Sequence, residues 1–172
     1  MRAIWVVVAM VSGPALAAAA EPPAQAVRGQ AIFFDEKAAA QCGGCHALKG
    51  KGTAVGPDLS RLARLSPGAI VMAIRATSTE YVQTVTLKSG GEFPGMPAAK
   101  DETSVQFYDL SAKPPVLRKF DPKEVSSAKE NSKWKHPPST ASLSAGQLAD
   151  VIAYIKWASY GDTKAVNPAD TR

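Results

Sequence analysis

Two cysteines and a histidine fall within one short stretch of the chain, the sequence QCGGCH at residues 41–46. The spacing of Cys42, Cys45 and His46 is Cys-x-x-Cys-His, the attachment signature for a c-type haem. Two thiols can add across the two vinyl groups of one porphyrin, and two intervening residues let them reach both groups. The next residue then offers an imidazole to the iron as its proximal ligand. Because the chain has two cysteines in all, the sequence predicts one covalently bound haem c.

Three other kinds of site use a Cys-x-x-Cys pair. A thioredoxin-like dithiol requires a strand before the motif, whereas the preceding residues 38–41 indicate a helix end or a loop. A structural zinc site requires four ligands, and His46 and His136 would have to complete it from an unusual spacing. A simple disulfide between Cys42 and Cys45 would leave the adjacent histidine unexplained.

The first twenty residues are typical of a secretory signal peptide. A basic residue at position 2 precedes an apolar stretch that ends in a run of alanines, with residues 18–20 directly before Glu21, and small residues at that place favour cleavage. We therefore expect residues 1–20 to be removed and residues 21–172 to form one domain in the bacterial periplasm, where covalent haem attachment occurs. An uncleaved leader, which would anchor the protein to the membrane, is the alternative.

The composition excludes one class of partner. The chain has 172 residues and a formal net charge of +5, but its basic residues are dispersed and match no nucleic-acid-binding motif. We therefore expect no DNA or RNA role. A modest positive charge can instead favour an acidic protein partner during encounter.

Helical signals lie at both ends of the chain and after the cysteine motif. A first helix is predicted over about residues 24–37. Ser66 followed by proline indicates a second helix start, ending near Thr77. Ser144, with Gln147 three residues later, forms a capping box for a last helix.

Between the second and last helices the hydrophobic period changes to that of strands. β-branched and alternating residues predict four or five short strands at about residues 81–127. Pro94 indicates that the second of them is an edge strand. A meander of this kind is compatible with a small SH3-like barrel.

These motifs resemble those of class I cytochromes c. The chain has a Gly-Pro-x-Leu loop that begins at Gly56, ten residues after His46, and the last helix contains LADVIAYIK, as in that family. The resemblance implies that the carbonyl of Pro57 accepts a hydrogen bond from the His46 ring and that Leu59 packs on the haem.

The same resemblance implies the fold. It predicts a mainly α cytochrome c fold with N-terminal, middle and C-terminal helices around the haem. The first and last helices would cross at a contact of Gly29 and Phe33 against Ile152 and Tyr154. The strands at about 81–127 would be a small antiparallel β module inserted into it, similar to an insertion in some bacterial haem-binding domains. That similarity rests on residues 95–103.

The sixth iron ligand has two candidates. The family usually supplies a methionine from a Met-Pro pair shortly before the last helix. Met96 is followed by proline, as in the Met-Pro pair, but it lies within the strand module. His136 lies shortly before the last helix, where the family places its ligand, and is also followed by proline. We favour His136, with Met96 as the alternative, because of its place in the chain.

The predicted function is electron transfer between redox proteins, and we expect no enzymatic activity because two protein ligands leave the iron no open position. Partners would be a periplasmic dehydrogenase or another cytochrome. The alternatives are a haem subunit of a dehydrogenase complex and a haem-based sensor or peroxidase-like protein.

Overall fold

The computed structural model describes residues 21–35, 37, 41–76, 81–136 and 142–172. The predicted signal peptide at residues 1–20 lies outside the described residues, and so does Pro137 of the predicted His-Pro pair. Among the helices of the described part, none is long and apolar enough to cross a bilayer.

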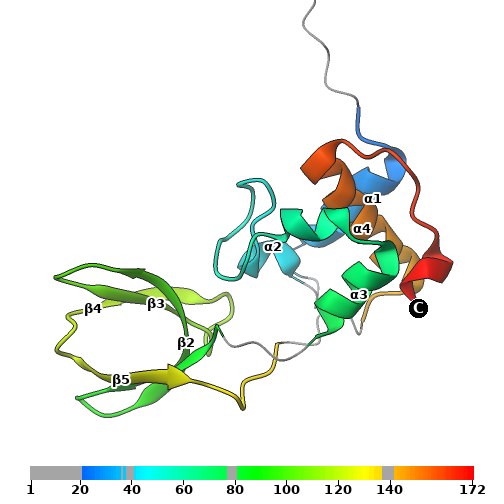
Figure 1. Cartoon of the computed structure of the whole chain (residues 1–172). Coiled ribbons are helices and arrows are strands. Elements are labelled where there is room, and N and C mark those ends of the chain that lie inside the picture. Colours follow the sequence, from blue (N-terminus) through cyan, green and yellow to red (C-terminus); the bar gives the residue numbers. More distant parts are fainter. Residues whose placement is uncertain (1–20, 36, 38–40, 77–80, 137–141) are drawn as a thin grey trace, which may run out of the picture.

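The helices gather into one body and the strands into another (Figure 1). The α-helices are α1 (Ala24–Phe33), α2 (Cys42–Cys45), α3 (Pro67–Arg75) and α4 (Ala145–Tyr160). Two 3-10 helices, η1 (Leu59–Arg64) and η2 (Pro168–Thr171), complete the helical part. Helix α1 begins where predicted but ends at Phe33, four residues early. The predicted caps of α3 and α4 are present, since Ser66 and Ser144 each accept a backbone N–H through the side chain.

Helices α1 and α4 cross at a glycine. A Cβ on Gly29 would lie 1.8 Å from the carbonyl oxygen of Asp150, so only glycine permits this approach. Next to it the rings of Phe33 and Tyr154 meet edge to face, with centroids 5.6 Å apart. The predicted contact is thus confirmed for Tyr154. It is wrong for Ile152, which is buried on another side of α4 in a cluster with Ile70 of α3.

The strands form a five-stranded antiparallel sheet in the order β4-β3-β2-β1-β5. They are β1 (Gln83–Leu87), β2 (Glu92–Lys100), β3 (Val105–Asp109), β4 (Val116–Phe120) and β5 (Val125–Glu130). The sheet has its own small core, formed by Val85, Phe93, Val105 and Phe107. The chain returns from β4 to place β5 beside β1, so β4 and β5 are the two edges.

The expectation that Pro94 lies in an edge strand is wrong, because β2 is the central strand of the sheet. The carbonyl of Pro94 accepts the N–H of Leu110 at 2.8 Å. The N–H and carbonyl of one strand residue point to the same side, so the donor that proline lacks would face the last residues of β3. A second proline, Pro97, lies at an irregularity in the pairing with β3. Both prolines thus lie at places where few hydrogen bonds between the strands are lost.

The fold is a mixture of α and β structure rather than mainly α. The sheet extends over residues 83–130, while the helical body comes from the segments on either side. The cytochrome-like helices were predicted, and the strands lie within or close to the predicted range of about residues 81–127.

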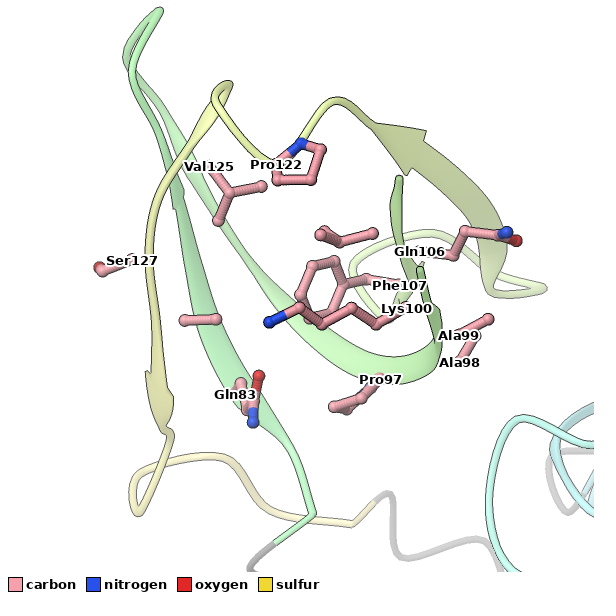
Figure 2. Close-up of a pocket in the computed structure, with 12 residues that line it drawn as sticks. Gln83, Pro97, Ala98, Ala99, Lys100, Gln106, Phe107, Pro122, Val125 and Ser127 are labelled. Atoms are coloured by element: carbon pink, nitrogen blue, oxygen red, sulfur yellow. The ribbon is translucent and has the colours of Figure 1, made fainter. Parts of the chain in front are cut away.

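A cavity of about 610 Å³ opens in the sheet, between β2, β3 and β5 (Figure 2). Phe107 and Val105 are among its apolar lining residues, and the side chain of Lys100 extends across it. All its lining residues lie between Gln83 and Ala128, so the cavity belongs to the sheet and not to the cysteine motif.

The C-terminal tail packs on the helical body. The side-chain amide of Gln25 bonds both the N–H and the carbonyl of Val166, each at 2.9 Å. Thr171 is 1% exposed, and its hydroxyl lies 2.9 Å from the carbonyl oxygen of Ala145. These contacts fix the segment after Gly161 to the helical body.

Candidate haem-binding site

The cysteine motif forms the single helical turn α2. Cys42 and Cys45 lie three residues apart in this turn, a spacing that puts both thiols on one side of it. The N–H of His46 donates to the carbonyl of Cys42 at 2.8 Å and closes the turn. A Cβ on Gly43 would lie 2.4 Å from the ring of Phe34, which shows how closely α2 packs on the end of α1.

The loop after the motif folds back over it. The N–H groups of Val55 and Gly56 donate to the carbonyl of Cys45 at 3.1 and 2.7 Å. The imidazole of His46 packs closely against Gly56. A Cβ atom on Gly56 would lie 2.6 Å from Cε1 of His46. No residue other than glycine fits beside the ring without moving it.

The same loop orients the imidazole. Nδ1 of His46 lies 2.8 Å from the carbonyl oxygen of Pro57. A carbonyl only accepts, so Nδ1 carries the proton and Nε2 is left free to bind a metal. The contact implied for Pro57 by the family resemblance is present.

The surroundings of His46 favour the neutral form of its ring. Burial lowers the pKa of His46, the Pro57 hydrogen bond raises it, and the neighbouring His136 lowers it. Since a neutral imidazole is the form that binds metals, the net downward direction suits a ligand.

The structure brings His136 to His46. Their ring centroids are 5.9 Å apart and the rings are inclined by 32°. Two imidazoles that share one metal ion, with metal–nitrogen bonds of about 2 Å each, hold their ring centres roughly 6 Å apart. The separation therefore fits a pair of axial ligands.

The other predicted residues are distributed around this pair. Leu59 is half-buried at the start of η1, in a cluster that includes Cys42 and Phe34. Met96 lies in β2, opposite Tyr108 of β3. The structure thus groups His136, Pro57 and Leu59 with the motif and places Met96 within the sheet.

The alternative uses of the two cysteines fit this geometry poorly. Burial raises the pKa of the Cys42 thiol to about 11 and also raises that of Cys45, whereas a redox dithiol needs an accessible thiolate. Within the part of the chain that the structure describes, no three His, Cys, Asp or Glu side chains converge as a metal site.

Comparison with known proteins decides the family. A family model described as Cytochrome c matches residues 26–112, just over half of the chain. The chain belongs to the cytochrome c family. No curated protein matches it in sequence. Cytochromes c bind haem c covalently and are generally electron carriers, so this cytochrome is a haem-c electron-transfer protein. The matched region contains α1 from Ala26 onward, the cysteine motif, α3 and the first three strands, and it ends before α4.

Two residues near the site carried no signal in the sequence. Trp134 meets the ring of His136 edge to face, with centroids 6.2 Å apart and the planes at 87°. Asn131 accepts the N–H of Trp134 through its side-chain oxygen at 2.9 Å. A polar segment rich in lysine and proline gave no reason to select either of them.

Proposed function

We propose that this cytochrome is a periplasmic carrier of single electrons with two histidine ligands. Cys42 and Cys45 would hold the haem through thioether bonds, and His46 and His136 would be the two protein ligands of its iron. The separation of 5.9 Å between the two imidazoles carries the proposal. The haem iron supplies the one-electron couple. The residues of the chain fix its position, exclude water and set its potential.

The nature of the ligands sets the working range of potential. Axial ligands and their surroundings together move haem potentials over about 0.8 V. A methionine favours ferrous iron and raises the potential, whereas a second imidazole favours ferric iron. Ligation by His136 therefore makes the protein a low-potential carrier, and two protein ligands leave no position for a substrate, consistent with a carrier rather than an enzyme.

The partners are redox proteins, such as a periplasmic dehydrogenase or another cytochrome. Lys49 and Arg64 converge on the ring of Tyr160, with the charged groups 5.6 and 5.2 Å from its centroid. Both basic residues are exposed, and a positive patch of this kind favours encounter with an acidic surface.

The test is the visible spectrum of the ferric, haem-loaded protein beside His136→Ala and Met96→Ala. We expect a low-spin spectrum without a methionine–iron charge-transfer band. It should turn high-spin in His136→Ala and stay unchanged in Met96→Ala. A charge-transfer band that disappears only in Met96→Ala would contradict the assignment.

A further inference from the structure

The sheet reaches the site through one short segment, residues 131–136. This segment follows β5 directly and ends at His136. It begins with a hydrogen bond between the two ends of the sheet, because the N–H of Asn131 donates to the carbonyl of Val82 at 2.9 Å. Val82 is fully buried and immediately precedes β1. The start of the segment is therefore fixed to the sheet.

Asn131 also fixes the residue that faces the histidine. The N–H of Trp134 is shared between the backbone oxygen of Asn131 at 3.2 Å and its side-chain oxygen at 2.9 Å. These bonds close a tight turn from Asn131 to Trp134. The direction in which Trp134 leaves the backbone is thereby set.

The indole is half-buried and its ring meets His136 nearly perpendicularly, at 87° and 6.2 Å. Edge-to-face contact is a favourable arrangement for two aromatic rings. The His136 ring in turn faces His46 at 5.9 Å. A continuous series of contacts thus leads from the sheet through Asn131 and Trp134 to the two imidazoles.

We propose that Trp134 is a positioning residue that holds the His136 imidazole against the iron, and that Asn131 anchors Trp134 to the sheet. This inference rests on the proposed function, in which His136 is the sixth ligand. The indole restricts the rotation of the His136 side chain, so the bound orientation is the prevalent one. Without the indole, His136 leaves the iron more often and an external ligand enters faster.

The experiment measures carbon monoxide binding to the reduced, haem-loaded full-length protein by rapid mixing. Entry of carbon monoxide requires departure of the sixth ligand. An edge-to-face contact is equivalent to roughly two- to tenfold in an equilibrium. We therefore expect Trp134→Leu, which keeps apolar bulk without a ring, to bind carbon monoxide several-fold to about tenfold faster than the wild type. Trp134→Phe, which keeps an aromatic edge, should remain within about twofold of the wild type.

Asn131 gives an independent pair of variants. Asn131→Ala removes the side-chain acceptor of the Trp134 N–H and leaves only the longer backbone bond at 3.2 Å, so it should accelerate binding. Asn131→Asp keeps an acceptor oxygen on the side chain and should not. Lys135→Ala, an exposed neighbour of Trp134, is the matched control and should behave as the wild type. If Trp134→Leu does not accumulate with haem, the asparagine pair decides the question.

Each outcome separates the two proposals. If His136→Ala turns high-spin and binds carbon monoxide rapidly while Trp134→Leu and Asn131→Ala both match the wild type, the positioning role is wrong and the ligand assignment stands. If His136→Ala leaves the spin state and the rate unchanged, both proposals are wrong. Equal acceleration in Trp134→Leu and Trp134→Phe would also contradict a role for the ring.

Discussion

The carbonyl oxygen of Pro57 lies 2.8 Å from Nδ1 of the His46 imidazole, eleven residues away in the chain. The contact assigns the proton to Nδ1 and leaves Nε2 free to bind a metal. It also fixes the plane of the ring, because the loop that carries Pro57 is itself bonded to the carbonyl of Cys45. The proximal side of the site is therefore determined by the backbone of one loop.

Gly56 is the most sensitive position in that loop. In Gly56→Ala the new methyl group would lie 2.6 Å from Cε1 of His46, so the ring or the loop must move. We expect a loss of about 1–3 kcal/mol in unfolding free energy and a fraction of high-spin ferric haem in the visible spectrum.

The matched control is Gly68→Ala in α3. The nearest atom to its new methyl group would be a carbonyl oxygen of Asp170 at 3.6 Å. Alanine there should be neutral or stabilising by up to about 1 kcal/mol. A low-spin spectrum and unchanged stability in Gly56→Ala would contradict this prediction, because the loop would then accommodate the methyl group without disturbing His46.

Gly29→Ala tests the crossing of α1 and α4. The methyl group would overlap the Asp150 carbonyl, at 1.8 Å, and both helices would have to separate. We expect a loss of about 3 kcal/mol and a fall in melting temperature of roughly 6–12 °C, measured by circular dichroism. Gly146→Ala, where the nearest atom is the Ser144 hydroxyl at 3.9 Å, should melt within a few degrees of the wild type. Equal melting of the two variants would contradict the close crossing.

Asp101 gives the sheet a defined dependence on pH. Hydrogen bonds from the backbone and hydroxyl of Thr103 and from Ser104 lower the pKa of this carboxylate to about 2. Because the folded pKa is below the unfolded value of about 3.9, its stabilising effect is complete above about pH 5 and is lost as the pH falls towards 2.

Urea unfolding of the wild type and Asp101→Asn should therefore differ most at neutral pH and converge as the pH approaches 2. Glu102→Gln, which removes the neighbouring carboxylate, controls for net charge. A difference between the wild type and Asp101→Asn that is the same at pH 6 and pH 2 would exclude the carboxylate as its source.

The sequence predicted what depends on neighbouring residues. The capping box at Ser144 and the start of α3 at Ser66 are encoded in short patterns, and each is found where expected. The cysteine motif is likewise local, since the five residues from Cys42 to His46 were enough to predict a haem c site. The contact of Pro57 with His46 was available through the family resemblance because the loop follows the motif at a fixed distance.

What the sequence could not predict depends on residues distant in the chain. The neighbours of Trp134 are brought together by the return of β5 to β1, and no local pattern records that pairing. Pro94 led to the wrong prediction of an edge strand, because the effect of a proline depends on which partner strand its missing N–H would face. The buried tail depends on Gln25, which lies at the opposite end of the chain and satisfies both polar groups of Val166.

The bond between Val82 and Asn131 has a consequence for how such a protein can change over time. The chain enters and leaves the sheet at adjacent points. Independently of the sheet, the two hydrogen bonds between Gln25 of α1 and Val166 of the tail hold the helical body together. A module with neighbouring ends can be gained, lost or exchanged without cutting the frame that receives it. A short linker between Val82 and Asn131 in place of residues 83–130 would therefore join the two crossings without moving the helical frame.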